Sequence, residues 1–266
     1  MFSSFLPGCF DQRQNMAFYD GTVLKLVHVL ISFYSFVWTW FSWTWKSLVS
    51  KGSKESLSQC RKDGRDLHKL PCHLALLVEE EVISYQDVCS MLVWSMSLGI
   101  SYLSVFDLKG TLKKNAVLLK GHLDKLQEDL MGRDQYKFTY QLHQSHSKKH
   151  SSNEGAQVHI ALLSPSDGKL DLVQTASDYC HAVANRMLKP TDINTDLVNS
   201  MLQAIKGFPD PDLLIKFGPT ESLCGYLPWQ IRLTEILNVQ THWRIDYETF
   251  LNVLHSYAKT EQRLGK

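Results

Sequence analysis

The sequence lacks an excess of charge of either sign, because 28 lysine and arginine residues nearly balance 27 aspartate and glutamate residues. A chain without a net field is not expected to bind nucleic acid or another polyanion through its overall charge, so any anion site must be local. Its six cysteines include no Cys-x-x-Cys pair and no zinc-finger spacing. This pattern favours reduced, buried thiols in a reducing compartment. No GxGxxG, P-loop or GxSxG motif is present either, so the common motifs assign no reaction.

One segment, residues 23–45, departs sharply from the average composition. It reads VLKLVHVLISFYSFVWTWFSWTW, and its only ionisable side chains belong to Lys25 and His28. As a helix it would be about 34 Å long, enough to cross the hydrocarbon core of a bilayer. A cleavable signal peptide fits less well, because the run is too long, is rich in tryptophan and is followed by no small-x-small cleavage site. The segment is therefore predicted to be a membrane helix.

The polar residues of this segment recur every three or four positions and share one helical face. A spanning helix could use that face to pack against another helix, and an interfacial helix could turn it toward water. Spanning is the preferred interpretation, because the lysines lie only at the two ends. Tryptophans crowd its C-terminal end and lysines and arginines follow it, so the C-terminal part is expected in the cytosol. The predicted organisation is a tail (1–22), the helix (23–45), a polar linker (46–70) and a globular domain (71–266).

The globular part alternates short apolar runs with segments of helical periodicity, which predicts an α/β domain with a mainly parallel sheet flanked by helices. Strands are expected at 73–78, 101–106, 157–163 and 213–217, with a further one at 226–231. Helices are expected at 84–98, 113–131, 175–188 and 196–205, and after an N-cap at Asp246. Residues 132–155 are expected to form a loop. The loop contains His143, His146 and His150, which have no acidic or cysteine partner nearby, so a solvated loop is favoured over a metal site.

Several motifs in this part resemble those of cis-prenyltransferases. The stretch DLLIKFGPTESLCGYLPWQ, at 212–230, is similar to the family's signature Asp-Leu-Leu-Ile-Arg-Thr-Ser-Gly-Glu, which an Arg and then Trp-Gln follow. HLALLV, at 73–78, resembles the family's first strand, which leads to an Asp-Gly-Asn diphosphate loop. With GYLPWQIRLTEIL (225–237) and EQRLGK (261–266), the chain is most similar to the accessory subunits of the Nogo-B receptor type. The resemblance covers roughly residues 70–266.

The departures from the catalytic pattern are as informative as the matches. Glu79-Glu80-Glu81 stands where the family has Asp-Gly-Asn, and glutamates would repel a polyanionic diphosphate. Glu79 alone could hold Mg²⁺ as the family's Asp does, although its acidic neighbours argue against this. Lys216 replaces the signature's first Arg and loses its bidentate geometry. Gly218 and Ser222 replace the signature's Ser and second Arg. The resemblance therefore implies a domain that doesn't turn over substrate alone.

The C-terminus supplies a different role by resemblance. Arg263-Leu264-Gly265 matches the RxG motif that reaches across the dimer interface into the partner's active site in this family. Its arginine and its backbone N–H could contact the substrate diphosphate there; a frayed, disordered end is the alternative. The segment 226–237 is the expected dimer seam, although ordinary core packing is an equal alternative for Trp229. The interface residues expected there are Tyr226, Leu227, Trp229, Ile231, Arg232 and Glu235.

The resemblance implies a required, non-catalytic subunit of the heteromeric dehydrodolichyl diphosphate synthase complex. That complex elongates farnesyl diphosphate with isopentenyl diphosphate to make the polyprenyl precursor of dolichol for protein glycosylation. Mg²⁺ would be held mainly by the catalytic partner, and the complex would lie on the cytosolic face of the endoplasmic reticulum membrane. Two alternatives remain: a membrane receptor or scaffold without an enzymatic role, and a self-sufficient homodimeric prenyltransferase.

Overall fold

The computed structural model describes residues 57–131, 139–144, 157–202 and 207–261, together with Lys25, His28–Leu30 and Ser32–Phe33 of the hydrophobic segment. The chain divides into two compact units, Met1–Ser53 and Lys54–Lys266. The few described residues of the hydrophobic segment are helical and exposed. No helix within the described residues is both long enough and apolar enough to cross a bilayer. The predicted membrane helix at 23–45 falls largely outside the described residues, so it stays a prediction.

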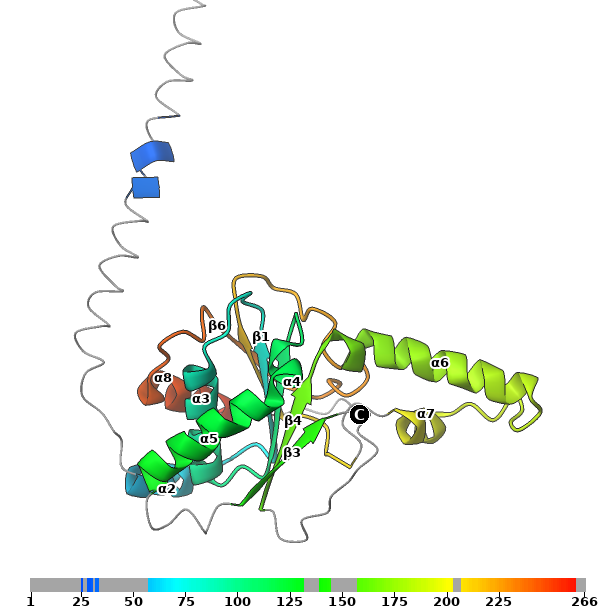
Figure 1. Ribbon diagram of the computed structural model, residues 1–266, viewed down its shortest axis with the longest axis horizontal. Helices are drawn as coiled ribbons and strands as arrows, with labels where there is room; N and C mark the ends of the chain where they lie inside the picture. The colour runs from blue at the N-terminus through cyan, green and yellow to red at the C-terminus, as the bar shows by residue number, and fades with distance from the viewer. Residues whose placement is uncertain are drawn as a thin grey trace, which may run out of the picture. The chain divides into compact units, whose positions relative to one another are not determined.

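The second unit is built on a six-stranded sheet whose order is β3-β4-β2-β1-β5-β6 (Figure 1). Every neighbouring pair of these strands is parallel, which confirms the predicted α/β class. The strands are β1 (His73–Val78), β2 (Tyr102–Asp107), β3 (Tyr140–Gln144), β4 (Val158–Leu163), β5 (Leu213–Phe217) and β6 (Glu235–Val239).

The central strands are buried on both faces, as their near-continuous apolar sequences require. Successive side chains of a strand point to opposite faces, so β1 contributes to two clusters. Leu74, Leu76 and Val78 enter the larger cluster, beneath the helices, whereas Ala75 and Leu77 enter a smaller cluster on the other face. The sheet is thereby fixed between two apolar layers.

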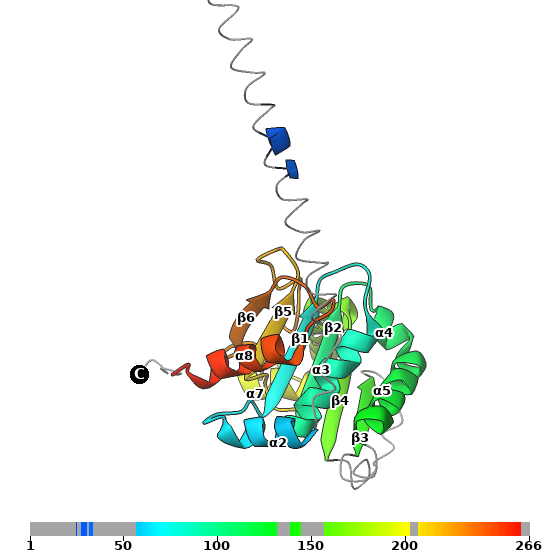
Figure 2. The same cartoon turned by 90° about the vertical axis from the view of Figure 1, so that its left-hand side faces the viewer.

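The larger cluster is covered by a layer of helices on one face of the sheet (Figures 1 and 2). Asp246 caps α8 through the Thr249 N–H, as the sequence predicted, and Ser84 caps α3 by accepting a hydrogen bond from the Asp87 N–H. This layer comprises α2 (Leu57–Asp66), α3 (Tyr85–Leu98), α5 (Ala116–Met131) and α8 (Tyr247–Ala258).

Part of the stretch predicted as a linker, 46–70, is a helix instead, namely α2. Its Cys60 is buried, and the helix packs against α3. Gly64 allows the close approach, because its Cα lies against the backbone of Leu98. A helix that buries only one stripe of side chains is mostly polar in composition, which is why this stretch resembled a linker. Because α2 packs on the domain, the globular unit begins before the predicted boundary at residue 71.

Three other expectations also need correction. The loop expected at 132–155 contains the edge strand β3, whose polar sequence YQLHQ hides a period-two pattern in which Tyr140 and Leu142 face the core. The expected strand at 226–231 is a run of turns instead, and β6 follows it. The expected helix at 113–131 is two helices, α4 (Thr111–Lys114) and α5, which meet at Asn115.

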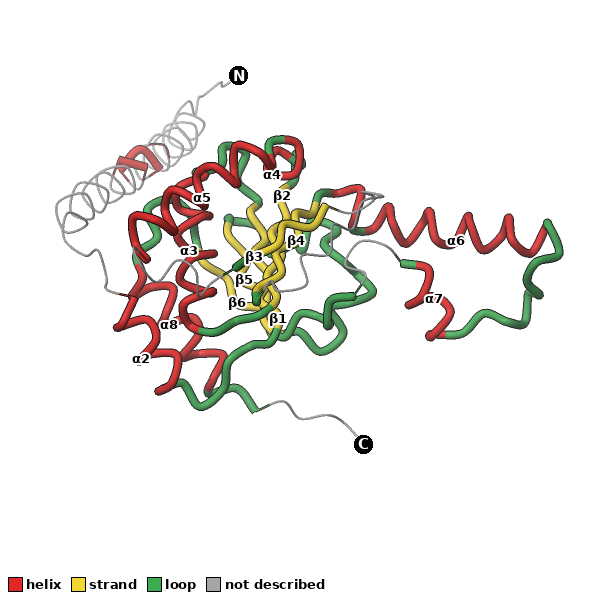
Figure 3. Tube along the Cα trace, turned by 60° about the horizontal axis from the view of Figure 1, so that its bottom comes forward, coloured by secondary structure: helices red, strands yellow, loops and turns green. Residues whose placement is uncertain are grey.

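The other helical element projects from the sheet as an arm, clearly visible in Figures 1 and 3. It consists of α6 (Lys169–Ala184), α7 (Thr195–Met201) and the loop that joins them. Asp171 and Thr175 anchor the first turns of α6 in the domain, but the rest of the helix is exposed or half-buried. Large apolar side chains are exposed along the arm, at Leu170, Val173, Met187 and Ile193.

The contact between α2 and α3 can be tested with a matched pair of glycine substitutions. A Cβ at Gly64 would lie 2.6 Å from the Leu98 carbonyl oxygen, whereas a Cβ at Gly121 of α5 meets nothing within 4 Å. We expect Gly64→Ala to lower the free energy of unfolding by about 1–3 kcal/mol. Gly121→Ala should raise it by about 0.5–1 kcal/mol. Urea unfolding of the full chain in mild detergent, followed by circular dichroism, measures both; equal effects would argue that α2 isn't packed on α3.

Candidate functional site at the carboxyl edge of the sheet

Ligands of parallel α/β sheets bind outside the carboxyl ends of the strands, so this edge is the candidate site. Strand β1 ends at Val78 and leads directly into Glu79, Glu80 and Glu81. Strand β5 lies next to it, with Phe217 opposite Val78. The two loops singled out from the sequence therefore meet at one place.

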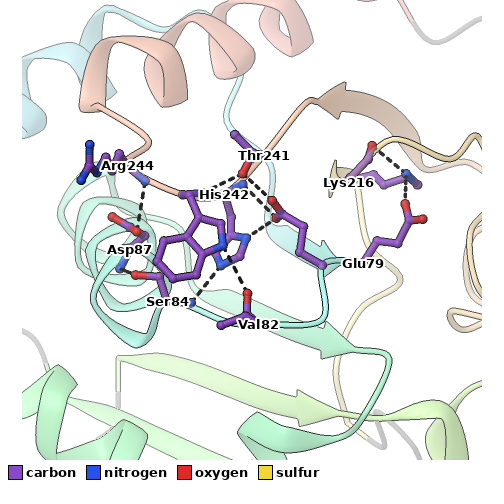
Figure 4. Close-up of polar contacts among 11 residues, drawn as sticks. Glu79, Val82, Ser84, Asp87, Lys216, Thr241, His242 and Arg244 are labelled. Carbon is purple, nitrogen blue, oxygen red and sulfur yellow. Dashed lines mark hydrogen bonds and ion pairs between the residues drawn. The ribbon is translucent and has the colours of Figure 1, made fainter. Parts of the chain in front are cut away.

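Glu79 and Lys216 form an ion pair at the centre of this edge (Figure 4). The Lys216 Nζ lies 2.9 Å from the Glu79 Oε2, and the lysine side chain is only 1% exposed. The same carboxylate oxygen accepts a hydrogen bond from the Thr220 N–H, at 3.2 Å. The hydrogen bond from Lys216 lowers the pKa of Glu79, which keeps the carboxylate charged. Lys216, which stands where the family's signature has an arginine, is thus already neutralised by Glu79.

Gly218 makes room for this pair. Its φ is +130°, and a Cβ there would lie 2.6 Å from the Glu79 Oε2. The Gly218 carbonyl also accepts a hydrogen bond from the Lys216 Nζ, at 3.3 Å. A cleft of about 500 Å³ opens beside this loop. Its described lining contains Glu221 and no lysine or arginine: Gly218, Pro219, Thr220, Glu221, Asn238, Val239 and Gln240. Such a lining doesn't favour a diphosphate.

Glu80 binds the loop that follows β6. Its carboxylate accepts hydrogen bonds from the Thr241 hydroxyl, the His242 N–H and the His242 Nδ1. The Nε2 of this buried imidazole accepts the Ser84 N–H at 3.0 Å, so the ring proton must lie on Nδ1. His242 therefore links Glu80 to Ser84, the N-cap residue of α3.

Further contacts join the same two loops (Figure 4). The Trp243 indole donates to the Val82 carbonyl, and the Arg244 N–H donates to Asp87. Arg244 has a φ of +53°, which is uncommon for a residue other than glycine. The loop after β1 is therefore held by side chains on several sides, and nothing in the sequence pattern indicated the partners Thr241, His242 and Trp243.

The third glutamate and the neighbouring strand ends are also paired. Glu81 lies 3.4 Å from the Lys109 ammonium at the surface. At the end of β2, the Asp107 carboxylate accepts the N–H groups of Thr111 and Leu112, although burial raises its pKa. Glu81 and Asp107 are therefore bound by groups of the domain itself.

Magnesium doesn't fit the described part of this site. The Glu79 carboxylate is bound to an ammonium, and the described residues contain no cluster of three or more side chains that could hold a metal ion. In the histidine-rich segment, His143 Nε2 lies 3.1 Å from His159 Nδ1, a contact to a residue outside that segment. His146 and His150 lie outside the described residues.

The expected interface residues separate into two groups. Tyr226 and Leu227 are each 1% exposed and belong to the smaller core cluster, where the tyrosine hydroxyl hydrogen-bonds with Ser104. Their prediction as interface side chains is wrong, because they have no surface left to bury. The other four are half-buried or exposed and stay an expectation: Trp229, Ile231, Arg232 and Glu235.

Two of these four have partners within the chain. The Trp229 indole donates to Asn199 of α7, and Arg232 pairs with Asp210 at 3.3 Å rather than with Glu235. The predicted RxG residues Arg263, Leu264 and Gly265 lie outside the described residues, just beyond Glu261.

Comparisons to known proteins identify the family and the fold. Residues 108–265 match the model of the Prenyltransf family, described as "Putative undecaprenyl diphosphate synthase". The chain belongs to this cis-prenyltransferase family. A solved lavandulyl diphosphate synthase from Lavandula x intermedia shares the fold, with a TM-score of 0.52 and 20% identity; the match covers 73% of this chain and 97% of that one.

Relatives within the family carry a more specific name. "Dehydrodolichyl diphosphate synthase complex subunit Nus1" of Mus musculus is 47% identical over 208 residues, which cover 77% of this chain and 69% of the mouse protein. The protein of the same name from Homo sapiens is 44% identical over 210 residues, covering 77% and 70% respectively. The resemblance to accessory subunits, read from the motifs, is therefore confirmed.

The role of the Glu79–Lys216 pair can be tested by removing its charges in turn. Glu79→Gln leaves the buried ammonium of Lys216 without a counter-charge, so we expect the melting temperature to fall by several degrees. Glu81→Gln is the matched control, because that side chain is 82% exposed; we expect a change within about 0.5 kcal/mol. The double variant Glu79→Gln/Lys216→Met should recover much of the loss. Thermal unfolding that affects both single variants equally would contradict this role.

The same pair predicts a pH dependence. Because the pKa of Glu79 is lowered in the folded state, its contribution is complete above the ordinary value of 4.5 and is lost as the pH falls through the lowered value. The difference in stability between the wild-type chain and Glu79→Gln should therefore narrow below pH 4.5 and stay constant above it.

Proposed function

We propose that this chain is the non-catalytic but required subunit of a heteromeric dehydrodolichyl diphosphate synthase complex. The names of its mouse and human relatives support this assignment. The catalytic partner would elongate farnesyl diphosphate with isopentenyl diphosphate, and the polyprenyl product would serve dolichol synthesis and protein glycosylation. This chain would stabilise the partner, anchor it at the membrane and complete its active site.

The Glu79–Lys216 ion pair carries the proposal that the chain is inactive alone. Catalysis of diphosphate transfer needs cationic and N–H donors that are free to stabilise the departing anion. Here the Lys216 ammonium and the Thr220 N–H both bind the Glu79 carboxylate. A substrate diphosphate would have to displace a charge-paired carboxylate from a buried ammonium and then face Glu80 and Glu81.

The ligands of the reaction would accordingly be held by the partner. We assign the Mg²⁺ mainly to the catalytic subunit, because the described residues here offer no suitable cluster. From this chain we expect only the C-terminal Arg263, Leu264 and Gly265 to reach the diphosphate, with the arginine neutralising charge and the glycine giving access to a backbone N–H.

The arm suggests where the partner binds. Helix α6 exposes Leu170 and Val173, and α7 is linked to the loop at Trp229 by the hydrogen bond to Asn199. Asn199 of α7 lines one cleft together with Trp229 and Arg232, two of the four remaining interface candidates. Exposed apolar side chains of α6 and this cleft would suit a subunit interface.

The location follows from the hydrophobic segment 23–45 and its cationic C-terminal flank. The positive-inside rule places the globular unit in the cytosol, and we assign the complex to the endoplasmic reticulum membrane. An elongating polyprenyl chain is strongly apolar, so a synthase held at a membrane can release its product directly into lipid.

The test of this proposal is incorporation of isopentenyl diphosphate into polyprenyl product. We expect no product from this chain alone and clear activity when a catalytic subunit is added. Gly265→Trp should then lower the activity of the pair about tenfold or more, because displacing a positioned donor is costly to catalysis. The control places the same bulky residue at an exposed position of α5, Glu128→Trp, and should leave the activity unchanged.

Each other outcome favours a rival function. Product from this chain alone would indicate a self-sufficient homodimeric enzyme. Partner activity that depends neither on this chain nor on Gly265 would favour a membrane receptor or scaffold.

A further inference from the structure

A second exposed apolar surface lies on α4 and α5, which follow the carboxyl end of β2 (Figure 1). Val117 is 88% exposed and Leu118 is 52% exposed, although both are aliphatic. They line a shallow depression together with Lys114, Gly121, His122 and Lys125. We call this set of residues the α5 patch.

The charged side chains in the lining of the α5 patch are lysines. Lys114 and Lys125 lie there, and no carboxylate is among the described residues of the lining. Among the described residues neither lysine forms an ion pair; the Lys114 ammonium donates only to the Lys109 carbonyl, at 3.1 Å. Asp124 accepts a hydrogen bond from the Tyr140 hydroxyl, and the exposed Glu128 and Asp129 lie on the next turn of α5, outside this lining. The patch therefore combines projecting aliphatic side chains with the two lysines.

This combination matches an anionic lipid surface. Lysines can lay their aliphatic stems on apolar groups while their ammonium groups reach lipid phosphates and carboxylates. Val117 projects from the surface, and a fluid bilayer can close around such a side chain, whereas a rigid protein partner would need a matching pocket. Gly121 adds no side chain, and nothing lies within 4 Å of the position of its Cβ.

Chain length also places lipid within reach. This step rests on the proposed membrane anchor: if the anchor ends at Trp45, residues 46–56 separate it from α2, and they can extend to at most roughly 40 Å. Helix α2 packs on α3 and α3 packs on α5, all in the same helical layer (Figures 2 and 3). A tether this short keeps the layer at a high local concentration of lipid.

We propose that the α5 patch docks the globular unit on the anionic lipid of the membrane that anchors the chain. The docking fixes the orientation of the domain, with the helical layer toward the lipid and the α6–α7 arm free for the catalytic partner.

Photo-crosslinking of the full chain in vesicles tests this proposal. Benzoylphenylalanine replaces Val117, and in a matched control it replaces Val173, an aliphatic residue of α6 that is 57% exposed. The vesicles contain phosphatidylcholine with radiolabelled phosphatidylserine. We expect several-fold more lipid adducts at position 117 than at position 173. Lys114→Glu/Lys125→Glu should reduce the adducts at 117 by about fivefold or more.

The outcomes separate this proposal from the proposed function. Flotation of the same samples reports whether the chain is anchored at all. A chain that floats but gives equal adducts at 117 and 173, no dependence on the two lysines, or adducts to protein instead of lipid overturns the docking alone. A chain that doesn't float overturns both the anchor and the docking. Placing the probe at Leu118 repeats the readout if the first variant fails to fold.

Discussion

The buried ammonium of Lys216 is the constraint on which the carboxyl edge of this domain depends. An ion held at 1% exposure is costly unless a counter-charge and further hydrogen bonds accompany it. Glu79 supplies the charge, the Gly218 carbonyl supplies an acceptor, and the positive φ of Gly218 leaves space for the carboxylate. A domain that bound diphosphate could use the ligand as the counter-charge. Here the chain supplies its own, so the edge is complete without a substrate.

The contacts of Glu80 likewise pair a charged group with partners inside the domain. Glu80 is satisfied by Thr241 and His242, and the imidazole in turn accepts the Ser84 N–H. Each polar group in this network has a partner, so the loop after β1 is structural. The family's fold is retained, and the loop after β1 is held to the loop after β6 by the chain's own side chains.

The sequence predicted the sheet well because buried parallel strands are short apolar runs, as at His73–Val78 and Leu213–Phe217. It failed at the edges, where β3 and β6 are only half-buried and their alternation is weak. Tyr226 and Leu227 show a further limit: composition identifies apolar side chains but not whether they face the core or a partner. The partners of Glu80 couldn't be predicted, since Thr241 and His242 lie about 160 residues away and form no motif.

The central claim is that the diphosphate loops of this chain are closed by its own side chains. Isothermal titration of isopentenyl diphosphate, with Mg²⁺, into the isolated full chain in detergent tests it most directly. The account predicts no saturable binding, because the Lys216 ammonium and the Thr220 N–H are already bound to Glu79. Saturable binding that disappears in Lys216→Met would contradict it.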